Sequence, residues 1–499
     1  MGHRLSAWWT QLTGTLWFVP GAIVVFMSGL AIGMIELSAR IDAEVLRDFP
    51  RVFGASADSS RALLSAIAGA MITVAGLTFS LTMVAVTQAS SQYTPRILRN
   101  FMRDRGNQVV LGVYVGIFAY CLLVVRTIRS GEEGRFVPSL AVVVGIALAM
   151  GSVGVLIFFV HHIASSLQAS TIVRRIADET LSAIDRVFPE GVGEEAPEGA
   201  GRAVIAAVAA GAWQPVRAAT TGYVQSLDAG GLLALADEHD LVVRLVAPVG
   251  DFVVEGTPVA WTAPNPAATR AAAARANGPA SGPAEPAVRD GAHVKHVAQR
   301  IAGLLTISAF RTVEQDAAFG VRQLVDIALK ALSPGINDTT TAVACVDYLG
   351  AVLVRLADRR IEASTRARDG VLRVIAPGPT FESLLRLAVD EIRQNAGGNV
   401  GVLARLFAML SLVASCTASA ERRRLIAEQI DLVREAVDGT VTSPHDRERL
   451  RARAAEARAV AEGEARAVAG AQGRARAGTI AGLADPAASR SGRRPQPDA

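Results

Sequence analysis

The sequence predicts a membrane α-helical protein with four transmembrane helices, followed by a C-terminal soluble α+β region that contains a small β-unit and an α-rich domain. Two observations support this fold class. The mean hydropathy of the 499 residues is positive, so the chain is too apolar to be wholly water-soluble. The long apolar runs are confined to residues 17–161. We therefore expect a membrane domain over residues 1–165 and a soluble part after it.

Four apolar runs reach or exceed the length of about 20 residues that a helix needs to cross a hydrocarbon core of about 30 Å. They lie at residues 17–37, 62–90, 108–126 and 139–161. The first run has Trp8, Trp9 and Trp17 as interfacial anchors and lacks a small-residue cleavage site. It is therefore expected to be retained as a span and not removed as a signal peptide.

The arginines are shared almost equally between the two sides of the predicted membrane domain, so the positive-inside rule decides little about its orientation. The densest group, Arg96, Arg99, Arg103 and Arg105, lies in the short second loop, and the long soluble half has no export signal. We expect a multi-pass protein of the cell membrane (inner or plasma membrane), with both termini in the cytoplasm.

The region after the fourth span divides into five segments by composition. Apolar residues at helical spacing continue the fourth helix into a cytosolic stalk over residues 166–190. Apolar residues separated by Gly-Asp and Gly-Thr-Pro turns predict a small β-unit at 212–262. A flexible linker rich in Pro, Ala and Gly is expected at 263–292, an α-rich domain at 293–466 and a disordered tail at 467–499.

The rhythm of the β-unit, including APVGDFVVEGTPV, resembles the barrel-sandwich fold of biotinyl and lipoyl carrier domains. Such carriers hold the cofactor by an amide bond to a turn lysine. Residues 222–262 contain no lysine, so a carrier function is excluded and no cofactor is expected.

Other function classes also lack support in the sequence. Only Lys295 and Lys330 are lysines among the 50 basic residues, and the arginines are scattered among acids, so no nucleic-acid partner is expected. The cysteines stand singly, without the paired spacing of a metal site. No phosphate-binding loop, nucleophile elbow or zinc-protease motif occurs. Neither catalytic residues nor a metal site are predicted.

Two long stretches resemble a known family. One runs from SARIDAEVL through SSRALLSAIAGAMITVAGLTFSLTMVAVTQASSQYTPRILRNFMRDRGNQVVLGVYVGIFAYCLLVVRTIR, and the other is EQDAAFGVRQLVDIALKALSPGINDTTTAVACVDYLG. Both are similar to the predicted bacterial integral membrane proteins grouped as domain of unknown function family 2254. The family pattern has proline after SPGIND, where this chain has Thr339. The resemblance implies several spans and a soluble C-terminal region, and it implies no activity.

The second predicted span carries small and hydroxylated residues on one face. At about 100° per residue, seven of them fall within roughly a quarter of the helix circumference: Ser65, Gly69, Thr73, Gly76, Ser80, Thr87 and Ser91. We call this face the hydroxyl stripe. It can be a seam against a neighbouring helix, because small residues allow close approach in lipid. It can also line a narrow pore that several subunits share. Matching grooves are available at Gly112, Gly116, Gly145, Gly151 and Gly154.

One charged side chain, Glu36, approaches the interior of a predicted span, and Arg126 is expected at a similar depth. Burying a charge in lipid is costly, so an ion pair between these residues would tie two helices together. The alternative is that Glu36 is an ion-entry carboxylate.

The soluble half contains a candidate polar corner. Pro334 and Gly335 end one predicted helix, and Asn337 or Asp338 caps the next. The functional alternative is a small ligand or ion site at this helix N-terminus. Upstream, a polar set can pair with the corner or with a neighbouring subunit: Arg311, Asp316 and Arg322.

Three functions of different classes follow. The first is an oligomeric channel or passive transport protein for an unidentified ion or small solute, with the second span lining the path and the cytosolic region serving assembly or gating. Four spans are few to enclose a path, so this function requires a homo-oligomer in the lipid bilayer. The second is a membrane-anchored scaffold or sensor without transport activity. The third, a membrane enzyme, is the least favoured because no catalytic set is present.

Overall fold

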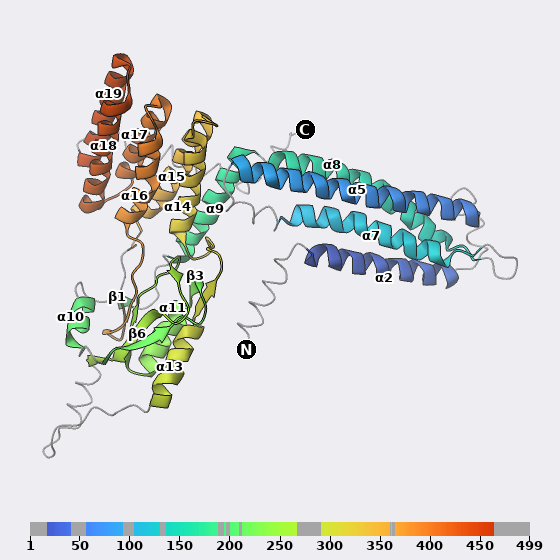
Figure 1. Cartoon of the computed structure of the whole chain (residues 1–499), viewed down its shortest axis with the longest axis horizontal. Helices are drawn as coiled ribbons and strands as arrows, with labels where there is room; N and C mark the ends of the chain where they lie inside the picture. The colour runs from blue at the N-terminus through green and yellow to red at the C-terminus, as the bar shows by residue number, and fades with distance from the viewer. Residues whose placement is uncertain are drawn as a thin grey trace, which may run out of the picture. The chain divides into compact units, whose positions relative to one another are not determined.

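The computed structural model (Figure 1) describes residues 17–40, 56–92, 104–129, 136–166, 168–187, 194–195, 200–208, 212–266, 291–359, 361 and 365–463. The chain divides into two compact units, which we call unit 1 (Met1–Ile172) and unit 2 (Val173–Ala499). The predicted disordered tail and most of the predicted linker lie outside the described residues.

Unit 1 contains four long helices: α2 (Phe18–Arg40), α5 (Ala57–Gln92), α7 (Arg105–Thr127) and α8 (Ser139–Ser166). They lie side by side, and α7 contacts each of the other three. Tyr114 and Tyr120 of α7 are fully buried. Their hydroxyls donate hydrogen bonds to the carbonyls of Ser152 (2.9 Å) and Ala141 (2.8 Å) of α8. Both buried hydroxyls are therefore satisfied, and α7 forms the centre of the unit.

The outer surface of unit 1 is apolar. Val25 of α2 is 72% exposed, Met150 of α8 is 70% exposed and Ile157 of α8 is 68% exposed. A surface of this kind is unfavourable in water and suits the hydrocarbon of a bilayer. The helix-rich membrane part that the sequence predicts is therefore present.

The predicted number of four spans is not settled by helix length and composition. Among the described residues, five helices are long and apolar enough to cross a membrane: the four of unit 1 and α15 (Thr339–Ala357). α15 differs from the others in its surroundings, because it packs against helices of unit 2 and buries Leu349 and Leu353 completely. It also carries Asp347, whose carboxylate pairs with Arg405.

The predicted stalk differs from the structure in two ways. The fourth span was expected to run on unbroken to residue 190, but α8 ends at Ser166 and a separate helix, α9 (Ala169–Val187), follows. α9 is also not a free-standing stalk, because it buries Ile176, Thr180 and Ile184 within unit 2. The amphipathic spacing that predicted the helix is the face that packs against α14 (Ala317–Leu332).

Unit 2 contains two sheets. The larger has the strand order β1-β8-β9-β4-β6-β2, and the smaller has the order β5-β3-β7. All pairings are antiparallel except that of β4 with β9. The strands are β1 (Glu194–Glu195), β2 (Gln214–Arg217), β3 (Gly222–Leu227), β4 (Leu241–Leu245), β5 (Phe252–Val253), β6 (Pro258–Pro264), β7 (Leu305–Ser308), β8 (Thr365–Arg368) and β9 (Val371–Ile375).

The predicted β-unit at 212–262 is therefore only part of the β structure. Its strands β4 and β3 pair with β9 and β7, which belong to the segment expected to be α-rich. Leu232 and Val243 lie in one buried cluster with Ile301 of that segment. Such pairing between segments distant in sequence leaves no local pattern, which is why the sequence divides what the fold joins.

The remaining helices of unit 2 complete its cores. The helices α10 (Ala200–Ala207), α11 (Ala229–Glu238) and α13 (Gly291–Gly303) contact the sheets. The others pack in sequence as α14, α15, α16 (Phe381–Asn395), α17 (Val400–Ser415), α18 (Ala420–Thr440) and α19 (Pro444–Glu462). Phe381 and Phe407 are fully buried among them. This helical layer holds α15 from several sides.

We expect Gly320→Ala to destabilise the protein, because a Cβ at Gly320 of α14 would lie 2.0 Å from Thr180 Oγ1 of α9. Overpacking of this kind costs about 1–3 kcal/mol, more than the roughly 1 kcal/mol that alanine gains over glycine within a helix. The matched control is Gly303→Ala, where nothing lies within 4 Å. Thermal unfolding of the full chain in detergent should show a lower midpoint for Gly320→Ala only. Equal midpoints for both variants would contradict the close contact.

Candidate functional site

The hydroxyl stripe lies on the exposed face of α5. The opposite face is buried against α7 and α8 through Leu64, Ala68, Met71, Ala75 and Thr78. At about 100° per residue, the centre of this buried face is roughly 180° from Ser80. The stripe residues from Ser65 to Thr87 are all exposed, and a Cβ at Gly69 or Gly76 would meet nothing within 4 Å. No helix described in unit 1 covers the stripe. The side chain of Ser91 lies outside the described residues.

The glycine grooves that can match the stripe are partly occupied by other helices. A Cβ at Gly112 of α7 would lie 2.9 Å from the Cα of Pro20 of α2, and one at Gly116 would lie 2.8 Å from Met27 Cγ. A Cβ at Gly145 of α8 would lie 2.9 Å from Leu64 Cδ2 of α5. Gly151 and Gly154 of α8 meet nothing within 4 Å. The glycines of α7 therefore bring α2 close, and the stripe has no groove within the unit.

The stripe hydroxyls fall into two groups. Thr73 donates to the carbonyl of Gly69 at 2.8 Å, and Thr87 donates to that of Met83 at 2.9 Å. These threonines are satisfied by their own helix, which lowers the cost of placing them in lipid. Ser65 and Ser80 have no hydrogen-bond partner among the described residues. Their hydroxyls remain available to a ligand or to another protein surface.

The ion pair predicted between Glu36 and Arg126 is replaced by a local one. Arg40 donates to Glu36 Oε1 at 3.0 Å, one turn along α2, and both side chains are more than 60% exposed. The two carboxylate-to-guanidinium partners thus lie on the same helix, where residues four apart are neighbours. The structure shows no bond between Glu36 and Arg126, although both are described.

The predicted polar set in unit 2 begins with Arg311 and Asp316. Asp316 caps α14 by accepting a hydrogen bond from the N–H of Phe319 at 2.9 Å. Arg311 donates to the same carboxylate at 2.9 and 2.7 Å, and its guanidinium lies 5.0 Å from the centre of the Phe319 ring. The Asp316 side chain is only 4% exposed. Burial raises the pKa of Asp316 above its usual value, although Arg311 acts against that rise.

A tight turn closes over this pair. Gly250 has a φ of +98°, in the region that glycine adopts most easily, and a Cβ there would lie 2.4 Å from Asp316 Oδ2. The next residue, Asp251, has a pKa raised by burial and lowered in part by Arg311. Arg311 therefore serves two carboxylates beneath one turn, which makes this a buried structural junction.

The corner residues Asn337 and Asp338 form a second helix cap. Asp338 accepts from the N–H of Thr341 at 3.0 Å and from its hydroxyl at 2.5 Å. These bonds, that of the hydroxyl first, lower the pKa of Asp338. Asn337 has a φ of +48°, which asparagine tolerates better than most residues. Thr339, where the family pattern has proline, accepts a hydrogen bond from Asn399 Nδ2 at 2.7 Å. The corner thus acts as a structural cap.

The structure does not bring the upstream set and the corner together. Asp316 precedes α14 and Asp338 follows it, so the 16 residues of this helix, about 24 Å at 1.5 Å per residue, separate them. Arg322 lies between, where it pairs with Asp326 at 2.7 Å and with Glu391 of α16. The three predicted elements are therefore a cap, a bridge between two helices and a second cap.

An ion pair that the sequence analysis missed joins α7 and α8. Asp104 caps α7 by accepting from the N–H of Gly106 at 2.7 Å, and His162 Nε2 lies 3.1 Å from the same carboxylate. The His162 ring stacks on Phe158 with ring centroids 5.4 Å apart. A Cβ at Gly106 would lie 2.7 Å from His162 Nε2, so glycine permits this approach. The available signal was an aspartate in N-cap position before an apolar run.

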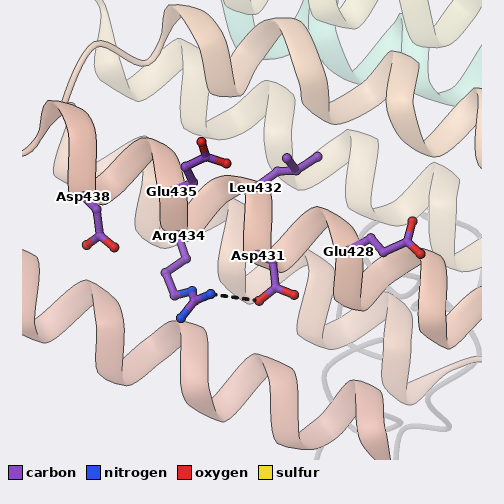
Figure 2. A pocket seen from close by; sticks show the side chains of 6 residues that line it. All are labelled: Glu428, Asp431, Leu432, Arg434, Glu435 and Asp438. Carbon is purple, nitrogen blue, oxygen red and sulfur yellow. Dashed lines mark ion pairs between the residues drawn. The ribbon is translucent and has the colours of Figure 1, made fainter.

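The face of α18 carries an acidic groove (Figure 2). It is lined by Glu428, Asp431, Leu432, Arg434, Glu435 and Asp438. Arg451 and Arg458 of α19 pair with Asp438 and Asp431. These arginines neutralise much of the acidic charge. Among the described residues, no group of three or more His, Cys, Asp or Glu side chains is placed to hold a metal ion.

The two caps predict opposite responses to acid. Asp316→Ala should cost about 2 kcal/mol of unfolding free energy, because it removes a cap and the partner of Arg311, and Asp338→Ala should cost about 1 kcal/mol. The lowered pKa of Asp338 means that its advantage over alanine is lost as the pH falls below about 3.9. The raised pKa of Asp316 means that the folded state takes up a proton first, so the advantage of wild type over Asp316→Ala grows as the pH falls toward about 3.9.

Thermal unfolding of wild type and both variants between neutral pH and about pH 3 measures these responses, since the range spans the unfolded pKa. Arg386→Ala, which removes an exposed pair with Glu382, serves as a control for general acid effects. Gaps that narrow equally for both caps would contradict the assignment for Asp316.

The chain was compared with known proteins. The family described as "Predicted membrane protein (DUF2254)" matches residues 13–411. The uncharacterized proteins Rv1290c of Mycobacterium tuberculosis and Mb1321c of Mycobacterium bovis are each 32% identical to it over 476 residues, which cover 93% of this chain and 84% of each relative. No solved structure matches the chain. The resemblance seen in the two sequence stretches is confirmed, and the chain belongs to the DUF2254 family of predicted membrane proteins.

Proposed function

We propose that this protein is a homo-oligomeric channel or passive transport protein of the cell membrane, in which α5 of each subunit lines a path for a small ion or solute. Unit 2 serves assembly or gating on the cytoplasmic side, where both termini lie. The observation that carries the proposal is the position of the hydroxyl stripe, which faces away from every described helix of unit 1. One subunit cannot enclose a path with such a face, so several subunits must supply it.

Four spans fit the spacing of the charged residues in unit 1. One boundary is marked by Glu36, Arg61 and Arg126, and the other by Asp104 and His162. From Arg126 to Asp104 the chain advances 22 residues along α7, which is about 33 Å of helix and close to the hydrocarbon thickness. α15 is left out of this count because its apolar residues are buried within unit 2.

The stripe suits a weakly polar path more than a strongly selective one. It offers hydroxyls and glycines, and no charged side chain occurs between Arg61 and Arg96. Rings of side chains around an axis set which species pass a channel. Hydroxyl rings without charge support passive passage and argue against a proton relay through carboxylates.

Unit 2 is connected so that it can respond to the spans. α9 begins three residues after α8 ends. It is anchored in unit 2 by the close contact of Thr180 with Gly320 and by the pairing of Asp185 with Arg355 at 2.9 Å. A change at the end of α8 would therefore reach α14 and α15 through a short and rigid connection.

The alternative function is a membrane-anchored scaffold or sensor without transport. Its support is the size of unit 2 and the acidic groove on α18, which offers a surface to a basic partner. It requires no path through the bilayer, so transport measurements separate the two functions.

Flux through liposomes tests the proposed function. Purified wild-type protein should release a trapped small cation or anion, and Ser80→Leu and Thr73→Val should each reduce the rate by about tenfold or more, because they narrow the path and remove hydroxyls. Ala147→Leu adds bulk to an exposed position on α8 and should leave the rate unchanged. If wild type passes no ion, and the two stripe variants change only thermal stability, the channel function is wrong.

A further inference from the structure

The length of α5 exceeds what a bilayer can cover. The helix has 36 residues, which is about 54 Å at 1.5 Å per residue. A hydrocarbon core of about 30 Å covers roughly 20 of them. Figure 1 shows α5 continuing past the start of its neighbour α7.

Contacts within unit 1 show which part of α5 extends beyond the bundle. Leu64 of α5 and Tyr120 of α7 both lie against Gly145 of α8, within 2.9 and 3.5 Å of the position of a Cβ. From this shared level, the neighbouring helices run antiparallel, and 16 residues lead from Tyr120 to Asp104 and also from Leu64 to Ser80. Ser80 therefore lies at about the depth of the Asp104–His162 pair.

The part of α5 after Ser80 is uncharged and largely apolar. We call residues 81–92 the α5 extension; at 1.5 Å per residue it reaches about 18 Å beyond the Asp104–His162 pair. Leu81 is 42% exposed, Met83 is 43% exposed and Val84 is 63% exposed. Beyond the boundary charges these side chains would meet water, which is unfavourable for a surface of this composition.

The exposed apolar residues of the extension continue the hydroxyl stripe. At about 100° per residue, Val84 lies roughly 40° from Ser80 around the helix, and Met83 lies roughly 60° away on the other side. Thr87 falls between them and is exposed. The stripe and the extension thus present one continuous face that runs from the spanning part into the region beyond it.

We propose that the α5 extension packs against the α5 extension of a second copy of this chain. The inference rests on the oligomer of the proposed function and does not depend on an ion path. Copies in one membrane share an orientation, so their extensions lie at the same depth and run parallel. The face carries no charge to repel an identical face, and its small residues allow close approach.

Disulfide formation between copies tests this contact. Val84→Cys is introduced into the full chain with Cys121→Ala, Cys345→Ala and Cys416→Ser, and membranes are oxidised with copper phenanthroline. A disulfide needs Cα atoms within about 7 Å, so a direct contact should give about fivefold more dimer on a non-reducing gel than positions facing lipid. The matched controls are Val25→Cys of α2 and Ile157→Cys of α8, which are 72% and 68% exposed.

A second variant covers failure of the cysteine-free chain to fold. Val84→Cys in the otherwise wild-type chain retains Cys121 and Cys345, which are buried. Val84→Glu should also lower the subunit number measured in detergent, whereas Val25→Glu should not.

Three outcomes decide the inference. Disulfide dimer at Val84→Cys supports it, whether or not liposomes show flux, and dimer without flux rejects the path alone. A thiol at residue 84 that forms no dimer and reacts with a membrane-impermeant maleimide overturns the inference, because the face is then open to water. A thiol that forms no dimer and is protected also overturns it, because another part of the same chain then covers the face.

Discussion

The close approach of neighbouring helices to α7 determines what every other face of unit 1 can meet. In lipid, apolar surface alone gives little reason for helices to associate, so packing and hydrogen bonds must hold them. Gly112 and Gly116 let α2 come within contact of the α7 backbone, and the buried hydroxyls of Tyr114 and Tyr120 bond to α8. With α2 and α8 in place, α5 can bury only one face. The opposite face, with its hydroxyls and glycines, is the one left open.

A similar device connects the membrane part to the rest of the chain. Thr180 of α9 occupies the space that a side chain at Gly320 would need, and Asp185 of α9 pairs with Arg355 of α15. α9 is therefore part of unit 2, although the sequence pattern joins it to the last helix of unit 1. This placement gives the chain a short connection between its two units and a reason for α15, which is apolar enough to span, to remain inside unit 2.

The predicted site residues illustrate why local patterns identify caps better than sites. Asp316 and Asp338 each precede a helix, and both cap it as their position predicts. Their shared membership of one polar corner does not follow, because α14 lies between them. Glu36 found a partner one turn away in place of Arg126, since a neighbour on the same helix is always within reach. The Asp104–His162 pair escaped notice because its two residues are 58 positions apart.

The sequence by itself determined the elements: the apolar helices of the membrane part, the stripe on one face of α5, the helix caps and the family. Each depends on residues within a few turns of one another, where composition and period are sufficient. Only the tertiary structure decided which face of α5 is covered, that α9 belongs to unit 2, and that β4 and β3 complete their sheets with β9 and β7. These arrangements depend on contacts between distant segments, and such contacts are selected by shape and hydrogen bonding that no single stretch of sequence contains.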